Sequence, residues 1–140
     1  MLVNEREFDI TELCPDTITV PINVEAVWTL LTPKKRLQNT RIKHIVAASL
    51  YYSSTQTRKA DFIDHIAETF HTLCYLYGSD LKFILSGDIN RLNINPILNL
   101  SRDLVQIVKV LTRKNPYAIP DVVITNISAL YQSPETLPPL

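Results

Sequence analysis

The chain has 140 residues, of which 46% are hydrophobic and 20% charged, and its 14 Lys and Arg residues balance 14 Asp and Glu residues. This length fits one domain, and the composition excludes an intrinsically disordered tail. A net charge of zero removes bulk positive charge as an argument for a nucleic-acid partner, although a local site stays open. Two cysteines, Cys14 and Cys74, make no disulfide framework, and two glycines exclude a glycine-rich phosphate loop.

Targeting signals are absent from the sequence. No apolar run reaches the length of a membrane span, and the first seven residues lack the layout of a signal peptide. We therefore expect an intracellular location, the nucleus included.

Strand patterns dominate the first third of the chain. Residues 7–13 are mixed and short and carry no clear signal. Residues 26–32 end at Pro33 and predict a strand, and the basic, polar stretch 34–43 predicts a loop. Residues 44–52 form a nearly continuous apolar run, whose length favours a buried strand over a helix.

The clearest helix pattern runs from about residue 57 to 77. Its apolar residues recur in steps of three and four and predict one buried face: Phe62, Ile63, Ile66, Ala67, Phe70, Leu73, Cys74 and Tyr77. The opposite face is predicted to be solvated and holds Asp61, Asp64, His65, Glu68 and His71. Gly78 stands where a helix often ends.

The remaining patterns predict strands around one short helix. Residues 81–85 predict a buried strand, and a short helix is expected near 101–105, capped by Ser101. Residues 106–111 and 121–127 predict two strands joined by a turn at 116–120. The residues from Tyr131 onward predict an extended tail. A helix between buried strands indicates an α/β fold with the helix packed on a sheet. The short connection between the last two strands makes that sheet mixed.

Asp88 and Asn90 follow directly on a predicted buried strand, where α/β folds place their chemistry. A carboxylate there can accept a proton from water or help to hold a hard cation, and an amide can orient water or phosphate. The alternative is that the Asp-x-Asn sequence only closes a turn, and the residue pattern alone favours this alternative.

One local basic cluster interrupts the balanced charge. It has five cations within ten residues: Lys34, Lys35, Arg36, Arg41 and Lys43. These residues suit contact with phosphates, and they suit a solvated loop equally well. The histidines show no metal-ligand spacing.

Five segments of the chain follow one another in a recognisable order: Val27-Trp28 with Pro33 to Leu37, Ile45 to Tyr51, Phe83 to Asn90, Leu111 to Arg113, and Asp121 to Asn126. The third segment contains a Gly-Asp-x-Asn signature at Gly87 to Asn90, with Ile89 in place of Phe. The order of these segments resembles the endonuclease–exonuclease–phosphatase family, and more specifically the endonuclease domain attached to non-LTR retrotransposon reverse transcriptases.

The resemblance implies a DNase-I-like α/β sandwich of two packed sheets with helices outside, and magnesium-dependent hydrolysis of DNA phosphodiesters. In that scheme Asp88 positions or activates the attacking water and contributes to the magnesium site. Asn90 orients the phosphate, Tyr51 contacts it, and Asp121 supports the site. The nucleic acid is then expected to lie along Lys34, Lys35, Arg36, Arg41, Thr112 and Arg113.

Two departures from the family pattern bear on activity. Nothing upstream of Val27 resembles the family's asparagine or its metal-binding glutamate, and the sequence ends at Leu140, before the family's Ser-Asp-His motif. We therefore expect a partial copy with an unmatched segment 1–26, a partial domain 27–131 and a proline-rich tail 132–140.

Removal of single members of a catalytic set is costly, so weak or no activity is expected. The alternative function is a catalytically dead remnant that associates with other chains through exposed sheet edges. A phosphomonoesterase or lipid phosphatase of the same superfamily is a third possibility, disfavoured by the basic loop and by the retroelement-like order.

Overall fold

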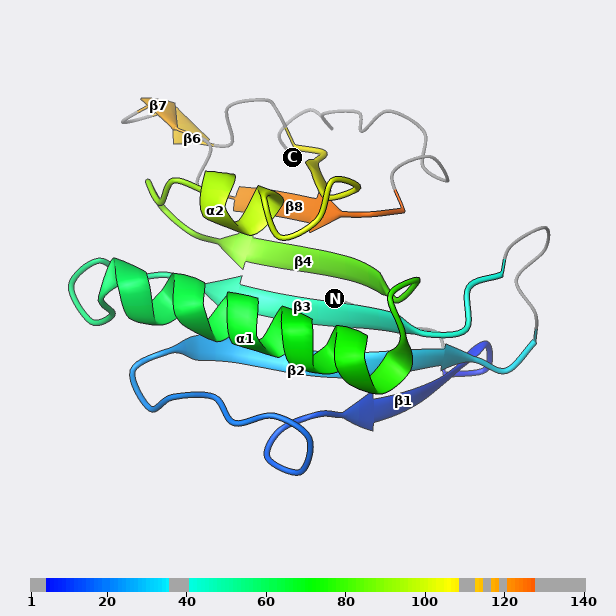
Figure 1. Cartoon of the computed structure of the whole chain (residues 1–140). Coiled ribbons are helices and arrows are strands. Elements are labelled where there is room, and N and C mark those ends of the chain that lie inside the picture. Colours follow the sequence, from blue (N-terminus) through cyan, green and yellow to red (C-terminus); the bar gives the residue numbers. More distant parts are fainter. Residues whose placement is uncertain (1–4, 36–40, 109–112, 115–116, 119–120, 128–140) are drawn as a thin grey trace.

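The computed structural model describes residues 5–35, 41–108, 113–114, 117–118 and 121–127. A six-stranded sheet in the order β1-β2-β3-β4-β8-β5 forms the body of the molecule, and helix α1 lies across one face of it (Figure 1). The sheet strands are β1 (Phe8–Glu12), β2 (Glu25–Pro33), β3 (Ile45–Tyr51), β4 (Lys82–Asp88), β5 (Val105–Gln106) and β8 (Asp121–Thr125). The remaining elements are α1 (Lys59–Tyr77), α2 (Asn95–Leu98) and the hairpin of β6 (Arg113–Lys114) with β7 (Tyr117–Ala118).

The sheet is mixed, as predicted. Strands β3 and β4 are parallel, and α1 provides the crossover between them, whereas the other pairs in the sheet are antiparallel. A parallel pair needs such a crossover because its two strands run in the same direction. The crossover places the ends of β3 and β4 at the same edge of the sheet.

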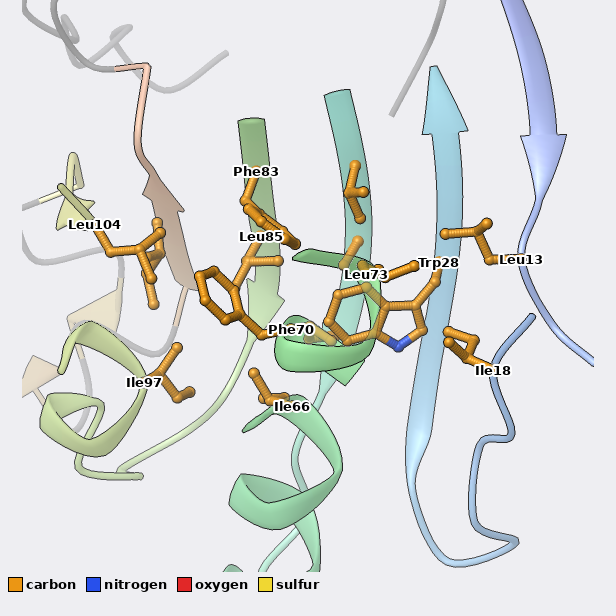
Figure 2. Packing of buried hydrophobic residues seen from close by; sticks show 14 of the residues in the cluster. Leu13, Ile18, Trp28, Ile66, Phe70, Leu73, Phe83, Leu85, Ile97 and Leu104 are labelled. Carbon is orange, nitrogen blue, oxygen red and sulfur yellow. The ribbon is translucent and has the colours of Figure 1, made fainter. Parts of the chain in front are cut away.

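The main core lies between α1 and the sheet (Figure 2). Helix α1 buries Phe62, His65, Ile66, Thr69, Phe70 and Leu73, which recur in steps of three and four. Phe70 stacks on Phe83 of β4 with ring centroids 4.5 Å apart, and Trp28 of β2 is fully buried nearby. Burial of each large apolar side chain contributes about 1.5–3 kcal/mol, so this layer holds the sheet and helix together.

The opposite face of the sheet, which we call the open face, carries no helix in the described part of the chain. A small cluster of Leu31, Ile45 and Ala47 is buried within it. Toward its margins apolar side chains reach solvent, with Ile10 44% and Val27 56% exposed. Strands β1 and β5 form the two edges of the sheet.

Several predicted elements differ from the structure. Of the predicted strand 106–111, residues 109–111 lie outside the described residues and the strand β5 covers only Val105–Gln106, while β7 falls within the predicted turn 116–120. The short helix predicted near 101–105 is wrong: the helical turn is α2, which ends at Leu98, before Ser101, and has Pro96 at its start. Proline has a preset φ and no N–H, so it suits the first turn of a helix. Ser101 instead accepts a hydrogen bond from the Asp103 N–H at 3.4 Å. Residues 8–12, which gave no clear signal, form the edge strand β1.

The prediction of a solvated His65 is also wrong. His65 is 4% exposed, and its Nε2 accepts a hydrogen bond of 3.0 Å from Trp28 Nε1. A residue three positions after Phe62 lies on the same helix face whatever its type. The prediction considered only apolar residues for this face, so it placed the polar His65 on the opposite one. A buried indole N–H needs an acceptor, and the imidazole provides one.

Within the part of the chain that the structure describes, no helix is both long enough and apolar enough to cross a membrane.

Candidate functional site

Three neighbouring strands bring their predicted site residues to the same end of the sheet, which we call the Asp88 end. Tyr51 is the last residue of β3, Asp88 the last of β4 and Asp121 the first of β8. In the register of the sheet, Asp88 pairs with both Tyr51 and Asp121. Paired residues point to the same face of a sheet, so these three side chains share the open face.

Gly87 allows the strands to meet at this end. A Cβ added at Gly87 would stand 1.7 Å from the backbone oxygen of Leu50 in β3. Real Cβ atoms never approach an oxygen so closely, so any other residue would push β3 and β4 apart. The Gly-Asp pair therefore has a structural reason: the glycine makes room beside β3 for the aspartate that follows.

A turn fixes Asp88 and Asn90 immediately after β4. The Asn90 N–H donates to Asp88 Oδ1 at 2.9 Å, and Asn90 has a φ of 51°, which asparagine tolerates well. The Asn90 side-chain Nδ2 donates to the Tyr52 carbonyl at 2.6 Å, while the Tyr52 N–H donates to the Asp88 carbonyl at 3.0 Å. Asp88 and Asn90 therefore do close a turn, and this turn leaves Asp88 Oδ2 without a hydrogen bond among the described residues.

The row at the Asp88 end is strongly acidic. Glu25 of β2 pairs with Tyr51, so Glu25, Tyr51, Asp88 and Asp121 follow one another across four neighbouring strands. Sequence reasoning missed Glu25, because its place in the row depends on the register of β2 against β3. Carboxylates opposite one another repel, which favours a cation or a hydrogen-bond donor between Asp88 and Asp121.

The row does not form a closed metal centre. Glu25 lies two strands from Asp88, roughly 10 Å away at the ordinary strand spacing, which is too far to share one ion. Among the described residues, no group of three or more His, Cys, Asp or Glu side chains is placed to hold a metal ion. Asp88 and Asp121 are thus the two neighbouring carboxylates that could contribute to a cation site.

The basic residues do not join the acidic row. Lys35 and Arg41 line a cavity beside the last residues of β2 and the segment that precedes β3. This cavity lies at the end of the sheet opposite the Asp88 end. The length of β3 separates the two ends, about 20 Å for six steps of about 3.3 Å. Lys34 forms an ion pair with Asp9 at 3.5 Å and donates to the Glu5 carbonyl at 2.8 Å.

The other predicted nucleic-acid contacts are only partly described. Arg36 and Thr112 lie outside the described residues. Arg113 belongs to β6, and Figure 1 draws the β6–β7 hairpin beyond the end of the sheet at which β8 begins.

Asn126 has a structural role that sequence reasoning did not assign. Its side-chain Oδ1 accepts the Phe83 N–H at 2.8 Å, and its Nδ2 donates to the Leu81 carbonyl at 3.0 Å. The neighbouring Thr125 hydroxyl donates to the Phe83 carbonyl at 2.6 Å. These bonds attach the end of β8 to the start of β4, so they set the register that places Asp121 opposite Asp88.

The sheet, the β3–α1–β4 crossover and the open face together form a partial α/β sandwich with the predicted DNase-I-like fold. The comparison with solved structures gives the human Nocturnin catalytic domain with bound sulfate anion, at a TM-score of 0.53 and 14% sequence identity. The similarity covers 87% of this chain and 49% of that chain, so this chain spans about half the length of the structure it matches. At this identity the similarity shows the fold. No family model and no curated protein sequence matches the chain.

Proposed function

We propose that the chain is part of a retroelement-type endonuclease domain, whose Asp88 end acts on DNA phosphodiesters with magnesium and has weak or no activity in this chain alone. The observation that carries the proposal is the row formed by Tyr51, Asp88 and Asp121, placed by register at one end of the sheet. This row coincides with the segments that resemble the retroelement endonucleases, and it lies on a sheet of the nuclease-type fold.

Each residue of the row suits one task. Asp88 keeps Oδ1 in the turn and has Oδ2 available to accept a proton from an attacking water. Tyr51 is exposed, so its hydroxyl can donate to a phosphate oxygen. Asn90 donates through its Nδ2 to the Tyr52 carbonyl, so we assign it mainly to positioning the turn that carries Asp88. Its side-chain oxygen remains to contact the substrate.

The donor set supports only a weak magnesium site. Magnesium in phosphate-processing sites is commonly held by one or two carboxylates together with substrate oxygens and water. Asp88 and Asp121 match that minimum, and the described residues add no third ligand. When bound, the ion would neutralise developing charge on the phosphate. Low activity follows from this short ligand list.

A binding function without catalysis is the second candidate. The exposed Ile10 and Val27 on the open face, and the unpaired edges β1 and β5, favour association with another chain. This candidate predicts concentration-dependent self-association of the purified chain and no effect of Asp88 substitution on any DNA property.

Plasmid nicking with magnesium tests the proposal. The purified chain should bind duplex DNA with an affinity that falls as salt rises, and it should nick plasmid little above background. Asp88→Ala is the test variant, and Asp103→Ala, which removes an exposed carboxylate elsewhere, is the matched control. Absence of DNA binding would contradict the proposal. Robust nicking that Asp88→Ala leaves intact would contradict the assignment of the site, and robust nicking that Asp88→Ala abolishes would contradict the low activity.

A further inference from the structure

A cavity of about 700 Å³ lies at the end of the sheet opposite the Asp88 end. It is bounded by the end of β2, the segment that leads into β3 and the turn that precedes β4. Its polar lining consists of Thr32, Lys35, Arg41, Lys43, His44 and Asp80. A volume of this size suits a small-molecule group as large as a nucleotide.

The charge of the cavity is strongly one-sided. Of the described residues that line it, Lys35, Arg41 and Lys43 carry positive charge and only Asp80 carries negative charge. Among the described residues, the two ion pairs are Lys34 with Asp9 and Arg58 with Asp61, and neither involves a cavity residue. These three cations are thus available to a ligand, whereas Lys34 is occupied on the strand beside them. Concave placement of like charges raises the local concentration of anions more than a flat surface does.

The histidine in the lining is held in place. His44 Nδ1 lies 3.1 Å from the Thr32 hydroxyl, and the His44 ring packs against Tyr77 with centroids 5.3 Å apart. These two contacts hold the imidazole in place and give the cavity one rigid wall. A preorganised wall lowers the cost of ordering the site around a ligand.

We propose that this cavity is a phosphate-binding site that holds the backbone of a nucleic-acid strand, separate from the Asp88 end. The inference rests on the proposed function, and it deepens it by locating an anchoring contact far from the reaction. Arginine binds phosphate oxygens through its planar fork and lysine through a point charge, so Arg41 and Lys43 supply both modes.

The spacing of the two ends favours nucleic acid over an anionic membrane. About 20 Å separates the cavity from Asp88, which corresponds to about six nucleotides of a strand at a rise of about 3.4 Å each. A strand that starts in the cavity therefore needs at least about six nucleotides to reach the acidic row, whereas a membrane would meet only a concave opening. Binding at the cavity needs no metal, so it is separable from the chemistry at Asp88.

Fluorescence anisotropy with a labelled 12-nucleotide single-stranded DNA in EDTA tests this site. EDTA removes the metal that the proposed reaction requires, so a failure here and a failure of hydrolysis are independent results. The test variant is Arg41→Gln combined with Lys43→Gln. The matched control, Lys59→Gln with Arg102→Gln, removes the same charge from exposed positions outside the cavity lining. The exchange Arg41→Lys with Lys43→Arg keeps the charge.

The slope of log affinity against log salt reports the number of phosphate contacts. Loss of two contacts should reduce this slope by about 1.4, because each contact to a single strand contributes about 0.7. The control and the charge-keeping variant should retain the slope of the original chain. An unchanged slope in the test variant, or an equal loss in the control, would overturn the site. Binding to phosphatidylserine vesicles without binding to DNA would also overturn it.

Discussion

The buried pair of His65 and Trp28 predicts that acid weakens the fold. Desolvation lowers the pKa of His65 below its usual value, and the neighbouring Glu68 carboxylate partly opposes this shift. His65 Nε2 accepts the Trp28 N–H, so protonation of that nitrogen would set two donors against each other. Trp28 is fully buried, and its N–H would lose its acceptor.

The sign and size of the effect follow from proton linkage. The pKa of His65 is lower in the folded state than in the unfolded state, so the unfolded chain binds the proton more readily. Stability is therefore fully present above the unfolded pKa of about 6.5 and is lost as the pH falls below it. The loss is at most about 1.4 kcal/mol for each pH unit, and with an unfolded pKa of about 6.5 it is at most about 1.4 kcal/mol in total between pH 7.5 and 5.5.

Urea unfolding at pH 7.5 and 5.5 measures this loss. His65→Gln keeps an acceptor for Trp28 and cannot titrate, so it should lose clearly less stability over this interval than the original chain. His71→Gln changes an exposed histidine on the same helix and should behave like the original chain. An equal loss in the original chain and in His65→Gln would refute the assignment of the effect to His65.

Three further substitutions test the packing and the sheet register. Phe70→Ala should cost about 3–5 kcal/mol in the free energy of unfolding, because Phe70 is buried and stacks on Phe83. The control Tyr75→Ala, at an 88% exposed position, should cost about 0.5 kcal/mol or less. Similar losses for the two variants would show that the Phe70 face of the helix is not buried. Gly87→Ala should cost more than about 4 kcal/mol or abolish the cooperative thermal transition seen by circular dichroism, and a normal transition would contradict the close approach to β3. Asn126→Ala should cost about 1–3 kcal/mol in urea unfolding because it removes two hydrogen bonds to β4, and no change would show that the register is set elsewhere.

The sequence patterns predicted most of the central strands and the long helix. The runs at 26–32 and 44–52 and the helix at 57–77 correspond to β2, β3 and α1 with boundaries shifted by one or two residues. These elements have a strong period or a long apolar run, which is the most reliable local signal. The edge strand β1 escaped prediction because it is short, and its two apolar residues, Phe8 and Ile10, alternate with polar ones over too few positions to give a clear strand pattern.

The candidate site was predictable where it depends on strand ends and not where it depends on register. Tyr51, Asp88 and Asp121 could be placed together because each lies at a strand terminus. Glu25 could not, since its place beside Tyr51 follows from pairing between β2 and β3. The sequence did not predict that Lys35 and Arg41 lie far from Asp88. This separation arises because both residues precede β3, whereas Asp88 pairs with the last residue of β3.

The location of the reactive end can be tested directly with Mn²⁺ as a paramagnetic probe. Proton–nitrogen correlation spectra would be recorded while Mn²⁺ is added to the chain in the presence of a short duplex DNA. We predict that the amide signals of Tyr51, Asp88 and Asp121 broaden first, and that Asp88→Ala removes this selectivity. Broadening that spares this end of the sheet, or that persists unchanged in Asp88→Ala, would contradict the assignment of the Asp88 end as the phosphodiester site.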